Sequence, residues 1–217
     1  MTPQERVPVV RAERHALCDS LLELGPEAPT LCSPWLTRDL AAHLVLREHR
    51  PDLASGMWFG PLEGRLQRGQ SSLAAGDYPA LVERVRSGPP WWSPMRVARV
   101  DALLNTAELV IHHEDALRGD GAPGPRREVP ERTARAVLVA VRRSASLMFR
   151  RSPVGVRLVA PGGEPISAGP REPLVTVTGE PVELLLLAYG RMRVADVALD
   201  GSPASVEALR NARLGVS

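Results

Sequence analysis

The stretch Glu108-Leu-Val-Ile-His112-His113-Glu-Asp115 decides how this chain is expected to fold. Glu108, His112 and Asp115 stand at i, i+4 and i+7, a spacing that places them on one face of an α-helix. A carboxylate and an imidazole on a buried face are costly unless a partner compensates them, and a divalent metal is the usual partner. The same face also carries apolar residues, so it is expected to point into a core: Val97, Val100, Leu104, Ala107 and Ile111.

One helix supplies only two metal ligands well, so a third is expected from another helix. His43, in Thr37-Arg-Asp-Leu-Ala-Ala-His43-Leu, is the best candidate. Together His43, Glu108 and His112 leave a fourth position for water or substrate, as in catalytic zinc sites. Asp115 is expected to accept a proton from a ring nitrogen of His112 and to fix its tautomer. The alternative is a salt-linked pair of Glu108 and His112, with His43 as a hydrogen-bonded core histidine.

The remaining histidines and two tryptophans have weaker claims to a site. His113 is rotated by about 100° from His112 on a helix, which favours packing or solvent over ligation. His15 is expected to be structural, with a role as fourth ligand left open, and His49 is expected at the surface. Trp91 and Trp92, in a proline-rich loop, either wall a pocket or only pack.

Composition excludes several classes of function. The 217 residues carry a net charge of +2 and only 4% aromatic residues, which argues against nucleic-acid binding. All 27 basic residues are arginine, so lysine Schiff bases and P-loop lysines are excluded. The sequence shows neither a transmembrane run nor the apolar segment of a signal peptide, which predicts a cytoplasmic protein without membrane association. Cys18 and Cys32 lack CxxC spacing and are expected to be free thiols, with Cys18 buried.

The order of expected elements predicts an α+β fold in two domains. Residues 1–151 are expected to form a helical, metal-binding bundle, and residues 152–217 a small α+β domain. The predicted helices of the first domain cover 7–24, 37–50, a weaker segment within 53–76, a short helix after Asp77, 93–117 and 130–150. Beyond 152 the pattern predicts strands at 154–160, 166–168, 174–178 and 194–199, with helices at 181–189 and from 203 onward.

Two motifs of this chain resemble a known superfamily. Trp35-Leu-Thr-Arg-Asp39-Leu-Ala-Ala-His43-Leu, followed by Glu108-xxx-His112-His113-x-Asp115, looks like the DinB-like, mycothiol-dependent maleylpyruvate isomerase superfamily. More narrowly, it resembles an actinobacterial branch known mainly as metal-binding proteins. The segment 182–191, which ends in Gly190-Arg191, is similar to the second domain of that family. The resemblance covers nearly the whole chain.

The resemblance implies a DinB-like four-helix bundle that holds zinc, or another divalent metal, through His43, Glu108 and His112. It also implies mycothiol as a thiol co-substrate that attacks a small electrophilic substrate, in an isomerase or a thiol transferase. Arg191 is a candidate to hold an anionic substrate, although it can also cap the end of its helix. Two alternatives remain: a non-catalytic metal-binding or sensing module, and a metal-dependent hydrolase. The substrate and the oligomeric state are left open.

Overall fold

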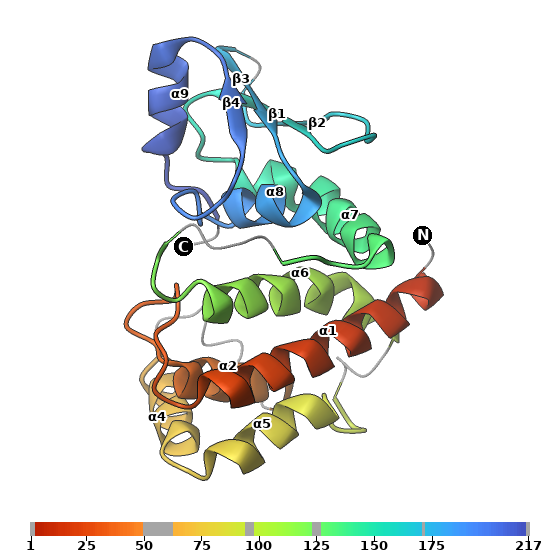
Figure 1. Cartoon of the computed structure of the whole chain (residues 1–217), viewed down its shortest axis with the longest axis vertical. Helices are drawn as coiled ribbons and strands as arrows, with labels where there is room; N and C mark the ends of the chain where they lie inside the picture. Colours follow the sequence, from red (N-terminus) through yellow and green to blue (C-terminus); the bar gives the residue numbers. More distant parts are fainter. Residues whose placement is uncertain (1–2, 50–62, 94–97, 123–126, 171, 216–217) are drawn as a thin grey trace. The chain divides into compact units, whose positions relative to one another are not determined.

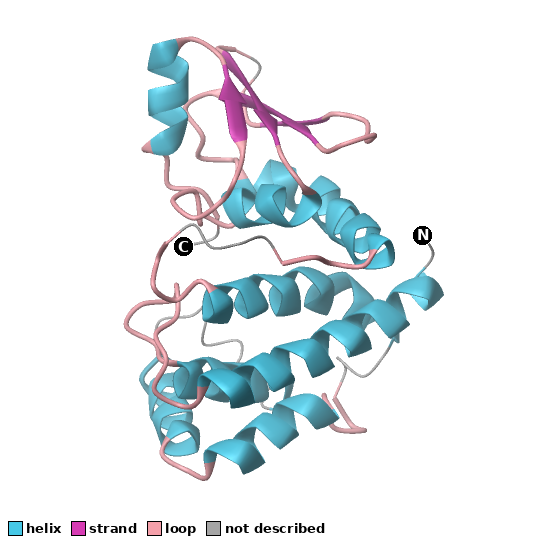
Figure 2. Cartoon of the chain, viewed as in Figure 1, coloured by secondary structure: helices cyan, strands magenta, loops and turns pink. Residues whose placement is uncertain are grey.

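The chain forms two compact units in the computed structural model, one ending at Gly121 and the other beginning at Ala122. The structure describes residues 3–49, 63–93, 98–122, 127–170 and 172–215. Among these residues the regular elements of the N-terminal unit are all helices, whereas the C-terminal unit combines helices with a sheet (Figures 1 and 2). The expected α+β class is therefore confirmed. No described helix combines the length and the apolar character needed to cross a membrane.

The N-terminal unit packs its helices around one core. Its helices are α1 (Pro3–Leu24), α2 (Thr37–His49), α4 (Glu63–Ala74), α5 (Tyr78–Ser87) and α6 (Ala98–Leu117). Helix α1 packs on α6 and α5, and α2 packs on α4 and α5. The described part of this unit thus holds five helices, in the order that the sequence pattern predicted, whereas the resemblance implied a four-helix bundle. Buried apolar side chains from all of them form the core, among them Leu17, Cys18, Leu40, Leu44, Ala74, Val82 and Leu109.

Local capping signals explain where several of these helices begin and end. Gly25 ends α1 with a positive φ of 77°, and its N–H donates to the carbonyl of Leu21. At the start of α2, the Asp39 carboxylate accepts the N–H of Leu36 at 3.0 Å. Asp77 caps α5 by accepting the N–H of Ala80 at 2.8 Å. The start predicted for the long helix at Ser93-Pro94 falls on positions 94–97, which lie outside the described residues, as do the side chains of Val100 and Leu104.

The C-terminal unit is built on a four-stranded sheet in the order β2-β1-β3-β4. Its elements are α7 (Glu131–Met148), β1 (Gly155–Val159), β2 (Ile166–Ala168), β3 (Leu174–Thr178), α8 (Pro181–Ala188), β4 (Ala198–Asp200) and α9 (Pro203–Arg210). Strands β1 and β3 are parallel, and the outer strands pair antiparallel to them. Helix α7 packs on α8 and β2. This helix was expected to close the first domain, because the periodicity changes only after residue 152.

Strand β4 is shorter than the segment 194–199 predicted from its apolar residues. It begins at Ala198. Upstream, the N–H of Val194 turns back to the carbonyl of Arg191, and the N–H of Asp196 donates to the buried carboxylate of Glu183 at 2.8 Å. These two backbone donors therefore cannot join the sheet.

Candidate metal centre

Two helices of the N-terminal unit bring the three expected ligands together. His43 comes from the middle of α2, while Glu108 and His112 stand one turn apart on α6. The Nε2 atom of His43 lies 3.5 Å from Oε1 of Glu108, and Nε2 of His112 lies 3.2 Å from the same oxygen. All three donor atoms lie within 4.8 Å of one another.

This arrangement fits a metal ion. Ligands bound tetrahedrally at about 2.0–2.1 Å are separated by about 3.3 Å, which agrees with both distances to Glu108. The His43 and His112 side chains are buried, with 11% and 10% of their surface exposed, whereas 24% of the Glu108 side chain is exposed. Two nitrogens and one carboxylate oxygen form a donor set of the catalytic zinc type. The residues present can therefore hold the divalent metal that the sequence predicted.

Asp115 orients the His112 ring from behind. Its Oδ2 lies 3.0 Å from Nδ1 of His112, the nitrogen that faces away from Glu108. Asp115 is fully buried, so this contact is shielded from water. A carboxylate on Nδ1 keeps the proton there and leaves the lone pair of Nε2 for a metal.

Cys32 lies next to His112 and Asp115, although the sequence did not predict it in the site. Its Sγ lies 3.1 Å from Oδ2 of Asp115 and 4.0 Å from Nδ1 of His112. The cysteine lies on the loop between α1 and α2, 80 positions before His112. Cys32, His112 and Asp115 form a second group of potential metal ligands.

The loop that carries Cys32 is held against the end of α6 by backbone contacts. The N–H of Leu31 donates to the carbonyl of Asp115 at 3.0 Å. One turn further on, Gly119 approaches the backbone of Pro29 so closely that an added Cβ would lie 1.8 Å from the Pro29 carbonyl oxygen. Only glycine permits this approach, which places Cys32 beside Asp115.

Arg47 supplies a positive charge at the edge of the candidate site. It stands one turn after His43 on α2, and its Nε lies 3.3 Å from Oε1 of Glu108. Its Nη1 also donates to the side chain of Asn105 on α6. The Asn105 amide in turn donates to Glu48, which forms a buried bidentate ion pair with Arg14.

Hydrogen bonds between the side chains of this site favour a charged His112 beside an ionised Glu108. Burial lowers the pKa of His43 below its usual value. Burial opposes the charge on His112 as well, but hydrogen bonds to Asp115, Cys32 and Glu108 outweigh it and raise the pKa of this ring. Burial also opposes ionisation of Glu108, yet its bonds with His112 and His43 hold its pKa well below the ordinary value. A metal binds only a neutral imidazole, so metal binding at His112 competes with protonation of this ring.

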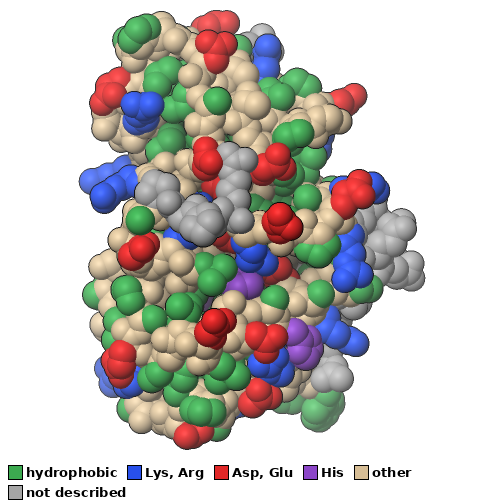
Figure 3. Space-filling model, viewed as in Figure 1, with side chains coloured by type: hydrophobic (Ala, Val, Ile, Leu, Met, Phe, Trp, Pro, Cys, Tyr) green, Lys and Arg blue, Asp and Glu red, His purple; other side chains and the backbone are tan. Residues whose placement is uncertain are grey.

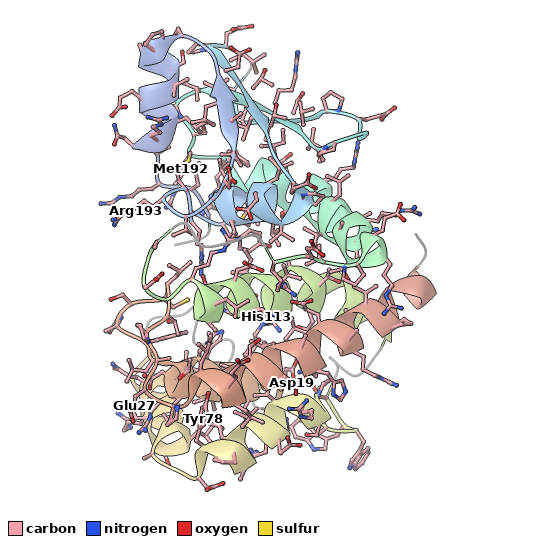
Figure 4. All side chains as sticks on the ribbon, in the orientation of Figure 1. Asp19, Glu27, Tyr78, His113, Met192 and Arg193 are labelled. Carbon is pink, nitrogen blue, oxygen red and sulfur yellow. The ribbon has the colours of Figure 1, made fainter. Side chains whose placement is uncertain are left out.

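The other three histidines take no part in this cluster. His113 points from α6 to α1, where Nδ1 lies 2.8 Å from Glu13 and Nε2 lies 2.9 Å from Ser20 (Figure 4). His15 is exposed beside Arg86, so the structure does not bring it to the site as a fourth ligand. His49 is half-buried rather than exposed. On the face drawn in Figure 3, histidine side chains lie among arginine and acidic side chains.

Comparison with solved structures identifies the fold. The chain is similar to the crystal structure of a mycothiol-dependent maleylpyruvate isomerase, with a TM-score of 0.63 and 16% sequence identity. The match covers 92% of this chain and 93% of the isomerase chain. This chain has the mycothiol-dependent maleylpyruvate isomerase fold. A variant of such an isomerase, with a histidine changed to alanine, matches over the same shares at a TM-score of 0.63 and 15% identity. No protein-family model and no curated protein matches the sequence.

The fold is the one that the resemblance of the two motifs implied, whereas the actinobacterial branch stays a prediction. At this level of identity the comparison concerns the fold, and the candidate ligands rest on the geometry described above. Arg191 belongs to the C-terminal unit of this fold, where its Nη1 donates to the carbonyl of Tyr189 at 2.6 Å. That contact satisfies a carbonyl just past the end of α8, and a role of Arg191 in substrate binding stays a prediction. Trp91 and Trp92 are exposed.

Proposed function

We propose that this protein binds one divalent metal, zinc, through His43 Nε2, Glu108 Oε1 and His112 Nε2. The observation that carries the proposal is the convergence of these three donor atoms, from two helices, to within 4.8 Å of one another. Asp115 supports it, because a carboxylate on Nδ1 directs the lone pair of His112 toward the other two ligands.

We further propose that this protein is a metal- and thiol-dependent enzyme, either an isomerase or a thiol transferase, that acts on a small electrophile. When bound, zinc supplies the Lewis acidity that favours the thiolate form of a thiol at neutral pH. Three protein ligands leave a coordination position for that thiol. Support for mycothiol as the thiol comes from the fold, since the two solved structures compared above are mycothiol-dependent maleylpyruvate isomerases.

The charges around the site suit anionic ligands. Besides the two histidines, the described side chains of the site include the carboxylates of Glu108 and Asp115 and the guanidinium of Arg47. With both histidines neutral, the site therefore has one net negative charge. A dication reverses that sign, because both histidines must be neutral to ligate it. The loaded site therefore attracts a thiolate or a substrate carboxylate. Arg47 holds Glu108 in place and contributes to this attraction.

The test is turnover of maleylpyruvate with mycothiol by the zinc-loaded protein. We expect activity that requires both the metal and the thiol, that is lost in His112→Ala and that persists in His15→Ala, a matched change of an exposed histidine on α1. Turnover by the metal-free protein would contradict the proposed mechanism. Zinc binding without any thiol binding in calorimetry would instead indicate a metal-binding module that is not an enzyme of this kind.

A further inference from the structure

The second group of potential metal ligands, Cys32, Asp115 and His112, has no role in the proposed function. Cys32 Sγ, Asp115 Oδ2 and His112 Nδ1 are separated by 3.1, 3.0 and 4.0 Å. Sulfur, oxygen and nitrogen ligands bound tetrahedrally at about 2.0–2.3 Å are separated by about 3.3–3.6 Å. Each observed separation is within about 0.5 Å of that range, so small side-chain shifts bring the three atoms onto one ion.

This second group differs from the first in chemical softness. It offers one sulfur ligand, while His43, Glu108 and His112 offer only nitrogen and oxygen. Soft cations prefer sulfur, whereas nitrogen and carboxylate ligands suit borderline and harder cations. Cys32 is half-buried, and Asp115 is fully buried. The cysteine is thus the member of the group that an incoming ion can reach from solvent.

His112 belongs to both groups, through opposite ring nitrogens. A neutral imidazole has one N–H and one nitrogen lone pair. A metal on Nε2 leaves the proton on Nδ1, where Asp115 accepts it at 3.0 Å. A metal on Nδ1 requires the proton on Nε2, where Glu108 accepts it at 3.2 Å. Each tautomer of His112 is therefore satisfied by an acidic side chain, and each supports only one of the two metal positions.

We propose that Cys32, Asp115 and His112 Nδ1 form an alternative site for a soft divalent cation, and that this site and the His43–Glu108–His112 site exclude each other. Binding of the soft cation displaces the thiol proton of Cys32 to solvent, and the sulfur then bonds to the metal. It also turns the lone pair of His112 away from the first site. A soft cation therefore removes zinc and inhibits any activity that depends on it.

The experiment titrates Cd²⁺ into the metal-free full-length protein and follows the ultraviolet charge-transfer band of a thiolate–cadmium bond. We expect the band to saturate at one equivalent in the wild type. It should be retained in Cys18→Ala, the matched change of the other cysteine, which is fully buried on α1. In Cys32→Ser the band should be lost. Circular dichroism of each variant verifies that the fold is intact.

A second measurement tests the exclusion. Adding Cd²⁺ to zinc-loaded protein should release zinc one for one, so that metal analysis finds one ion per chain throughout. His43→Ala, which disables only the first group, should keep the thiolate band, and His112→Ala should lose it. A missing band in the wild type, an unchanged band in Cys32→Ser, or two ions per chain would each overturn the proposal. Zinc binding through His43 is read separately, from the zinc content of His43→Ala before any Cd²⁺ is added.

Discussion

Replacing Asp115 with asparagine isolates the contribution of one buried charge to the metal site. The two side chains have nearly the same shape, so the helix and the loop beside it should be retained. Asparagine can still accept the Nδ1 proton of His112, but it brings no negative charge to the fully buried position 3.0 Å from that nitrogen. Changes at carboxylates that orient metal-binding histidines typically cost about 10–100-fold in metal affinity, which corresponds to about 1.4–2.7 kcal/mol.

Competition with a chromophoric chelator measures this effect. We expect Asp115→Asn to weaken zinc binding by about 10–100-fold, while its circular dichroism spectrum matches that of the wild type. Asp19→Asn is the control, because Asp19 is an exposed carboxylate on α1 that pairs with Arg86. A zinc affinity of Asp115→Asn within about twofold of the wild type, a smaller change than the range expected, would refute the argument that the negative charge of this carboxylate strengthens zinc binding by His112.

Three further predictions concern stability and thiol reactivity. Arg14→Met leaves the Glu48 carboxylate buried without its bidentate partner, so it should lower the free energy of unfolding in urea by about 3–5 kcal/mol. The double variant with Arg14→Met and Glu48→Met should recover much of that loss. An equal loss of stability in the single and the double variant would contradict this reasoning. Burial raises the pKa of Cys18 to about 12, so this thiol stays protonated until the pH approaches that value. Mass spectrometry after iodoacetamide treatment at pH 8 should therefore find Cys32 modified in the native protein and Cys18 modified only in urea. Gly119→Ala must displace the backbone of Pro29, so it should lower the melting temperature and alter the rate at which Cys32 is alkylated; a variant that behaves like the wild type in both respects would show that the loop adapts without cost.

Local signals in the sequence predicted most of the helices, because caps act within a few residues. Asp77 accepts the N–H of Ala80, and Ser202 accepts the N–H of Ser205, at the starts predicted for α5 and α9. Strand β4 was predicted too long because Glu183 binds the backbone of Asp196 from another element. Such a tertiary contact leaves no mark in the periodicity of the segment itself.

In the candidate site too, residues placed by helical spacing could be predicted from the sequence, whereas a residue placed by tertiary contacts could not. Helical spacing placed Glu108, His112 and Asp115 on one face, and the structure brings His43 to them. Arg47 follows His43 by one turn, so the same spacing contained the signal for it. Cys32 had no such signal, because its place depends on the backbone contact between Leu31 and Asp115 and on the missing side chain of Gly119.

Anomalous diffraction at the zinc absorption edge, from crystals of the zinc-loaded protein, tests the central claim most directly. We predict one strong peak at about 2.0–2.2 Å from His43 Nε2, Glu108 Oε1 and His112 Nε2, and no peak in crystals of His112→Ala. A zinc peak that lies away from these three atoms, or its absence from the wild-type protein at saturating zinc, would contradict the proposed metal centre.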